Sequence, residues 1–208
     1  MILAVLATET QREEWEKNSL AAAVTVIWAD SLQSLLMIDA DAYFDLQYEW
    51  NQERNRQCQL IHGKPLFVNE VVLTCSFIGP GFARINAWPG MLQRPLQEIA
   101  LHKTADAAAI KAVLHAMGWQ YELVPDITGM ISARVIATII NEAFFTLGSG
   151  VSDREAIDTA MKLGTNYPFG PFEWAEKIGK DKIISLLKEL SRNDARYIPA
   201  PALLNAGF

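Results

Sequence analysis

The chain of 208 residues contains no glycine before Gly63, although half of its residues are hydrophobic. The segment that precedes Gly63 therefore lacks the glycine-rich turn with which nucleotide-binding folds approach phosphate. Positively charged residues are outnumbered: the chain has 18 lysines and arginines against 24 aspartates and glutamates, which gives a net charge of −6. Such a chain has no basic surface to attract nucleic acid or an acidic membrane, and we expect neither as a partner.

Cysteine is limited to Cys58 and Cys75, which form no Cys-x-x-Cys pair and have no histidine at metal-ligand spacing. We therefore expect buried free thiols, no metal site and a reducing compartment. The apolar start, MILAVLA, has no basic region, is shorter than the core of a signal peptide and runs directly into the polar segment TETQREE. It predicts a first buried strand, and together with the cysteines it indicates a cytoplasmic protein.

Short apolar runs alternate with polar helical stretches in the first part of the chain. Strands are predicted at 1–7, 24–29, 42–46 and 65–72, and helices at 11–17, 31–36 and 47–60. A strand pair at 84–88 and 96–101, a helix at 105–117 and a strand at 119–124 follow. This alternation is typical of a parallel sheet with crossover helices, and it predicts an α/β domain over residues 1–124.

From residue 125 onward the pattern is helical. Helices are predicted at 130–147, 153–163, 172–177 and 182–191. The tail at 198–208 contains two prolines and is expected to be extended. Residues 125–208 therefore form a second, all-helical domain.

The run SDREAIDTAMKLGTNYPFGPFE, at 152–173, has the most specific pattern in the chain. Ser152 followed by Glu155 predicts a capping box, and Gly164 predicts a left-handed cap at the end of that helix. An aromatic, proline-rich turn at 167–172 then leads into the next helix. With the preceding run GMISARVIATIINEAFFTLGSGV, at 129–151, this segment resembles the helical C-terminal domain of the 3-hydroxyacyl-CoA dehydrogenases.

The resemblance depends on an Asn-Glu-Ala step at 141–143, an acidic-apolar pattern at 158–164 and the Tyr-Pro-Phe-Gly-Pro-Phe turn. It implies a reduced, Rossmann-like, mostly parallel sheet domain before the helical one, with NAD as the cofactor of the family. A Rossmann domain holds pyrophosphate on the N-terminus of its first helix. Here Thr8-Glu9-Thr10 follows the first strand, so loss of NAD binding is predicted. Asp30, after the second strand, is a candidate ribose ligand, although we favour a helix N-cap for it.

A His-Glu pair performs the acid-base step in the resembling enzymes. The matching positions in this chain hold Asn86 and Glu98, and a family asparagine that binds the reacting carbonyl is matched by Ala133. An amide accepts no proton near neutral pH, so the family mechanism loses its base. Glu98 is either a remaining active-site group in a cleft near Asn86 or a structural residue that pairs with Arg84 or Arg134.

Other candidates for chemistry are weaker. His62, His102 and His115 are expected to be surface or satisfied histidines rather than a replacement base. Lys64 either meets a phosphate of CoA or is a solvated lysine, and we favour the latter.

These patterns favour a degenerate member of the 3-hydroxyacyl-CoA dehydrogenase family, a pseudoenzyme that acts as a binding or structural protein. An acyl-CoA or related small molecule in the cleft between the domains is its expected ligand. The alternatives are an active NAD-dependent dehydrogenase of fatty acid metabolism and an enzyme of another class with Glu98 as a lone base. A homodimer is predicted, because the first long helix carries more apolar residues than one neighbour needs: Val135, Ile139, Ile140, Phe144, Phe145 and Leu147.

Overall fold

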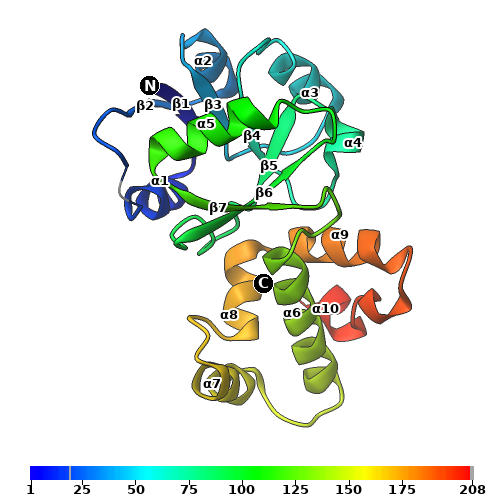
Figure 1. Ribbon diagram of the computed structural model, residues 1–208. Coiled ribbons are helices and arrows are strands. Elements are labelled where there is room, and N and C mark those ends of the chain that lie inside the picture. Colours follow the sequence, from blue (N-terminus) through cyan, green and yellow to red (C-terminus); the bar gives the residue numbers. More distant parts are fainter. Residues whose placement is uncertain (19, 207–208) are drawn as a thin grey trace. The chain divides into compact units, whose positions relative to one another are not determined.

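The computed structural model describes residues 1–18 and 20–206, and the chain divides into two compact units, Met1–Met130 and Ile131–Phe208. A sheet flanked by helices makes up the N-terminal unit, and the C-terminal unit is helical (Figure 1). The predicted fold class, a mostly parallel sheet domain followed by a helical domain, is confirmed.

Seven strands in the described part of the N-terminal unit form one sheet, in the order β2-β1-β3-β4-β5-β6-β7. Their bounds are β1 Ile2–Leu6, β2 Thr25–Ala29, β3 Ala42–Asp45, β4 Leu66–Asn69, β5 Phe82–Ile85, β6 Leu96–Leu101 and β7 Gln120–Val124. Neighbouring strands are parallel except for β5 and β6, which are antiparallel. The central strands are buried on both faces, as their continuous apolar runs require in a parallel sheet.

Helices cover both faces of this sheet. They are α1 Glu9–Glu16, α2 Leu32–Met37, α3 Gln52–Cys58, α4 Cys75–Ile78 and α5 Ala107–Met117. One face packs against Trp15 of α1 and Leu114 of α5. The other packs against Leu35 of α2, Cys58 of α3 and Ile78 of α4. Two apolar cores, one on each side of the sheet, result.

The strand order reverses at β1, which has β2 on one side and β3 on the other. In open α/β sheets, ligands bind outside the carboxyl ends of the strands at such a reversal. The residues that follow β1 and β3 therefore define where a ligand of this unit is expected.

The helical unit contains α6 Ser132–Gly148, α7 Arg154–Thr165, α8 Pro171–Ile178, α9 Lys180–Ser191, the short 3-10 helix Ala195–Tyr197 and α10 Pro201–Asn205. Phe144 of α6 packs edge-on against Phe172 of α8, with the ring centroids 4.9 Å apart. The guanidinium of Arg154 lies over both rings. This cluster links the first turn of α7 to α6 and α8.

The tail is not extended as predicted, because α10 begins at Pro201. Proline is well suited to the first turn of a helix, where its missing N–H has no partner to lose. The side chain of Asn141 holds the start of the tail: its amide donates to the carbonyl of Ile198, and its carbonyl accepts from the backbone of Ala200. The predicted range also includes 207 and 208, which lie outside the described residues.

The caps of α7 also differ from the prediction. Asp153 rather than Ser152 is the N-cap, with its carboxylate accepting from the backbone N–H of Ala156 at 2.8 Å. The left-handed residue at the other end is Asn166, and Gly164 lies within the helix. Both predictions chose a residue with the right chemistry one or two positions away from the true cap.

Asp158 of α7 caps a neighbouring helix. Its carboxylate accepts from the backbone N–H groups of Phe172 at 2.8 Å and Glu173 at 3.2 Å, in the first turn of α8. A Cβ atom at Gly170 would clash with the carboxyl group of Asp158. The Gly-Pro step of the turn is therefore required by this close approach.

Candidate functional site

The carboxyl ends of β1, β3, β4 and β5 lie at one edge of the sheet, which we call the strand-end edge. These four strands are consecutive in the sheet and mutually parallel. The residues that follow them include Thr8, Leu46, Glu70 and Asn86. These positions hold the candidate site of the N-terminal unit.

The first helix is closed at its N-terminus by its own side chains. Thr8 is the N-cap of α1, and its hydroxyl accepts from the backbone N–H of Gln11 at 3.2 Å. In return, the side-chain oxygen of Gln11 accepts from the backbone N–H of Thr8 at 2.9 Å. Glu9 adds a carboxylate to the first turn. A helix end capped in this way, with a negative charge beside it, does not suit a phosphate.

The amide of Gln11 also reaches across the strand-end edge. Its nitrogen donates to the carbonyl of Leu46, after β3, at 2.8 Å and to the carbonyl of Ala87, after β5, at 3.2 Å. Asn69, at the end of β4, donates to the same Leu46 carbonyl at 3.1 Å and accepts from the backbone N–H of Ala87 at 2.9 Å. These side chains lie at the edge where a ligand of such a sheet is expected, and a helix N-terminus that is closed by its own cap beside a carboxylate does not fit the pyrophosphate of NAD.

Asp30 follows β2, and its side chain is 94% exposed with Arg12 at 3.3 Å. The N-cap of α2 is Ser31, whose hydroxyl accepts from the backbone N–H of Ser34. The preferred interpretation of Asp30 as an N-cap was therefore wrong by one residue. A ribose role for Asp30 stays a prediction.

Asn86 directly follows β5 and is 3% exposed. Its side-chain oxygen accepts from the backbone N–H of Trp88 at 3.1 Å, which fixes the amide so that the nitrogen points away from that bond. This nitrogen is buried and has no hydrogen-bond partner in the described part of the chain. Buried donors without partners are uncommon in folded proteins.

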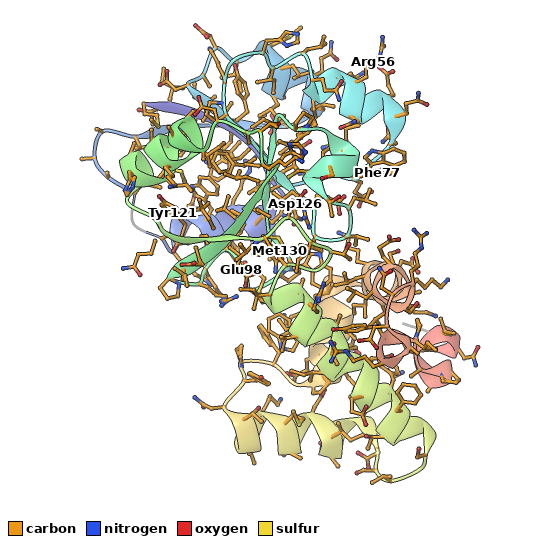
Figure 2. All side chains as sticks on the ribbon, turned by 45° about the vertical axis from the view of Figure 1, so that its right-hand side comes forward. Arg56, Phe77, Glu98, Tyr121, Asp126 and Met130 are labelled. Atoms are coloured by element: carbon orange, nitrogen blue, oxygen red, sulfur yellow. The ribbon has the colours of Figure 1, made fainter. Side chains whose placement is uncertain are left out.

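Glu98 lies on β6 and is 7% exposed (Figure 2). In the antiparallel register Ile85 pairs with Ile99, and one further step places Asn86 opposite Glu98. Residues in direct cross-strand positions have Cα atoms about 4.5–5.5 Å apart. The Asn86 nitrogen makes no hydrogen bond to Glu98 or to any other described residue, and a role for these two side chains in place of the family's His-Glu pair stays a prediction.

Arg84, one of the two partners that the sequence suggested for Glu98, does not pair with it. Arg94 lies 3.6 Å from its carboxylate, in the loop before β6. Arg84 is fully buried and instead binds Asp126 at 2.8 Å, while also donating to backbone carbonyls of Glu70 and Val71. Arg84 is therefore a structural residue that links Asp126 to the loop after β4, and it is not a partner of Glu98.

The remaining candidates are placed as follows. Ala133, which the resemblance matched to a family asparagine, is fully buried in α6 of the helical unit, and its methyl group donates no hydrogen bond. His102 contacts the hydroxyl of Thr104 at 2.7 Å, and His115 contacts that of Tyr121 at 3.3 Å. His62 is exposed. Lys64 is partly exposed and pairs with Asp39 at 2.7 Å.

One buried charged pair near the strand-end edge was not predicted. Asp45, the last residue of β3, is fully buried and accepts two hydrogen bonds from Arg54 of α3, at 2.7 and 3.0 Å. Burial raises the pKa of Asp45 above its ordinary value, although the guanidinium of Arg54 opposes this. Burial also raises the pKa of the neighbouring Cys58 thiol to about 12. Cys58 and Cys75 are both free and buried, as expected.

The described residues include neither a candidate metal centre nor a helix suited to span a membrane. They contain no group of three or more histidine, cysteine, aspartate or glutamate side chains that is able to hold a metal ion. In the same part of the chain, no helix is both long and apolar enough to cross a membrane.

Comparison with known proteins assigns the helical unit. Residues 129–206 match the family model of the 3-hydroxyacyl-CoA dehydrogenase C-terminal domain. A 3-hydroxyadipyl-CoA dehydrogenase of Escherichia coli is 39% identical over 112 residues, which are 50% of this chain and 24% of that protein. A 3-hydroxybutyryl-CoA dehydrogenase of Bradyrhizobium diazoefficiens is 40% identical over 98 residues, which are 46% of this chain and 33% of that protein. The matched stretch thus covers a third or less of these relatives.

Solved structures extend the likeness to the whole fold. An (S)-3-hydroxybutyryl-CoA dehydrogenase from Ralstonia eutropha has a TM-score of 0.71 at 19% identity, covering 98% of this chain and 92% of that one. A 3-hydroxybutyryl-CoA dehydrogenase from Escherichia coli K12 has a TM-score of 0.70 at 17% identity, covering 98% of this chain and 55% of that one. At these identities the likeness establishes the fold and no activity.

Proposed function

The chain belongs to the 3-hydroxyacyl-CoA dehydrogenase family, and from that premise we propose that it is a member without redox activity, which acts as a binding or structural homodimer in the cytoplasm. Asn86 is the observation that carries the proposal. Extending the β5–β6 register by one residue puts Asn86 across from Glu98; the Asn86 oxygen accepts from the backbone N–H of Trp88, and its nitrogen has no hydrogen-bond partner among the described residues. General-base catalysis needs a group whose pKa lies near the working pH, and an amide provides none.

The cofactor site supports the same proposal from a separate direction. The self-capped N-terminus of α1 and the hydrogen bonds of Gln11 across the strand-end edge do not suit a dinucleotide, which supports loss of the cofactor in addition to loss of the base. Restoring one of them alone would not restore hydride transfer.

The ligand we propose is an acyl-CoA or a related small molecule. The relatives' names give 3-hydroxyadipyl-CoA and 3-hydroxybutyryl-CoA as the compounds on which those proteins act. In this chain, the amide nitrogen of Asn86 donates and the carboxylate of Glu98 accepts, so together they suit a ligand hydroxyl, which does both. Binding through this pair needs no proton transfer.

A turnover assay tests the proposal. NADH oxidation with acetoacetyl-CoA is measured for the wild type and for the N86H variant, which places an imidazole opposite Glu98. We expect no turnover from either protein, because the cofactor site is closed in both. A clear rate in the wild type would establish the alternative, an active NAD-dependent dehydrogenase. A rate in N86H alone would show that the base is the single missing part and that NAD still binds.

A further inference from the structure

We propose that Gln11 is a built-in occupant of the dinucleotide position, a side chain that seals the strand-end edge from within and ties three loops of the sheet together. The inference rests on the proposed loss of cofactor binding, and it adds what replaces the cofactor. The three loops follow β1, β3 and β5 and come together only through the fold.

The position of Gln11 makes this tie possible. It is the third residue of α1 and receives a bond from the backbone of Thr8, so its amide oxygen is fixed by the turn that follows β1. With the oxygen fixed, both N–H groups of the amide are directed elsewhere. They meet the carbonyls of Leu46 and Ala87, two residues that are 0% and 1% exposed.

Asn69 completes the seal from the end of β4. It donates to the carbonyl of Leu46, which Gln11 also uses, and it accepts from the backbone N–H of Ala87, whose carbonyl Gln11 uses. The backbone N–H of Leu46 is in turn bonded to the carbonyl of Leu6, the last residue of β1. Backbone groups at the ends of buried strands need partners, and here side chains of the same chain supply them.

The seal has a consequence for any ligand that approaches this edge. A ligand that displaced Gln11 would leave the carbonyls of Leu46 and Ala87 without these donors and would place its phosphates beside the carboxylate of Glu9. The edge therefore works as a fixed joint of the sheet, and its order does not depend on a cofactor.

Hydrogen exchange of the full chain, followed by NMR without any ligand, tests the proposal. The Q11A variant removes the tie. The control is Q97A, since Gln97 of β6 also donates to two backbone carbonyls, those of Leu92 and Arg94, but both belong to the single loop that precedes its own strand. We expect Q11A to speed exchange at the N–H of Leu46 about tenfold, the factor that one lost hydrogen bond allows. Q97A should leave Leu46 unchanged.

If Q11A changes exchange only in residues 8–12, Gln11 is no more than a helix cap and the proposal fails. A measurement on the wild type covers the case in which Q11A does not fold. The side-chain amide protons of Gln11 should exchange more slowly than those of Gln57, which bonds to Glu53 on the surface. Equal exchange of the two amides would overturn the seal.

These outcomes are separate from those of the proposed function. The exchange measurements contain no nucleotide, so they report on the tie alone. An NADH titration of the wild type reports on cofactor loss, and binding there would refute the proposed function whatever the exchange rates are.

Discussion

Asp45 ends β3 with a fully buried carboxylate, and the guanidinium of Arg54 meets it with two hydrogen bonds. Removing one partner of such a pair leaves an uncompensated buried charge. We expect R54A to lower the free energy of unfolding by about 3–5 kcal/mol, measured by chemical denaturation.

Arg56 provides the matched control on the same helix. Arg56 lies on α3 (Figure 2) and pairs with Glu53 on the surface. The two side chains are 76% and 57% exposed. Exposed pairs contribute little, so R56A should leave the midpoint of denaturation nearly unchanged. Equal losses for the two variants would show that burial of Asp45 does not set the energy of its pair.

The ion pair between Arg84 and Asp126 predicts a pH dependence of stability. Burial of Asp126 favours its neutral form, but hydrogen bonds from the backbone of Cys75, from Arg84 and from the backbone of Ser76 outweigh burial and lower its pKa below 3.8. A carboxyl whose pKa is lowered by folding stabilises the fold above its unfolded pKa, and this stabilisation is lost as pH falls through the folded pKa.

The D126N variant isolates this contribution. Its free energy of unfolding should lie below that of the wild type near neutral pH, and the difference should shrink as the pH is lowered below about 4, the ordinary pKa of aspartate. Denaturant titrations over a series of pH values measure it. A difference that stays constant down to low pH would mean that the charge of Asp126 is not involved.

Some of these residues could be predicted from the sequence and others could not. Asn86, Glu98 and Ala133 were singled out because the resemblance to the family matches them to its site positions, and their roles stay predictions. The Asp45–Arg54 and Arg84–Asp126 pairs were missed, because a sequence shows a polar residue at the end of an apolar run but not which distant side chain meets it. Gln11 carried no signal beyond that of a helical first turn.

At the scale of the elements, the close contact between Asp158 of α7 and Gly170, at the start of α8, predicts how substitution of this glycine changes stability. The carboxylate of Asp158 lies against Gly170, and a methyl group there would clash with it. We expect G170A to lower the free energy of unfolding by about 1–3 kcal/mol, the usual cost of overpacking.

Gly164 is the control, because an added Cβ would meet nothing within 4 Å in this exposed turn of α7. G164A should raise the free energy of unfolding by about 0.5–1 kcal/mol, since alanine has less backbone freedom to lose in a helix. Thermal denaturation of the two variants decides the matter. Similar shifts of the two melting temperatures would remove the steric account of the turn.

The elements themselves were predictable because their apolar periodicity is clear, whereas their ends were not. Asp153 and Ser31, the true caps of α7 and α2, adjoin residues of equal capping chemistry. Helix α4 has four residues, too few for a periodic signal. Pro201 indicated an extended tail, but proline also begins helices, and only packing decides between the two.

At the scale of the whole molecule, the two units were accessible to different kinds of inference. The helical unit keeps the family motif in its sequence, and residues 129–206 match the family model directly. The sheet unit lies outside that match. Its similarity to solved dehydrogenase structures is seen in the fold, at a sequence identity of 19% over the chain, which is too low for the sequence to reveal it. Without glycines in the first turn, the sequence does not identify a Rossmann-like sheet. The sheet can still form, because those glycines are needed for the approach to the ligand and not for the strands.

The homodimer is a prediction at this scale. Ile140 and Phe144 of α6 are buried within the helical unit, whereas Val135 and Phe145 remain 48% and 40% exposed. We expect light scattering to give the mass of a dimer, and the double variant V135E/F145E to give a monomer, because burying two carboxylates at an apolar interface is unfavourable. A monomeric wild type would refute the homodimer.

Calorimetric titration of NADH into the wild type tests the central claim most directly, with acetoacetyl-CoA titrated separately into the same preparation. The account predicts no heat of binding for NADH, because the amide of Gln11 and the capped end of α1 fill the position that the cofactor needs. Binding of NADH at one molecule per chain would contradict the account and return the protein to the active dehydrogenases.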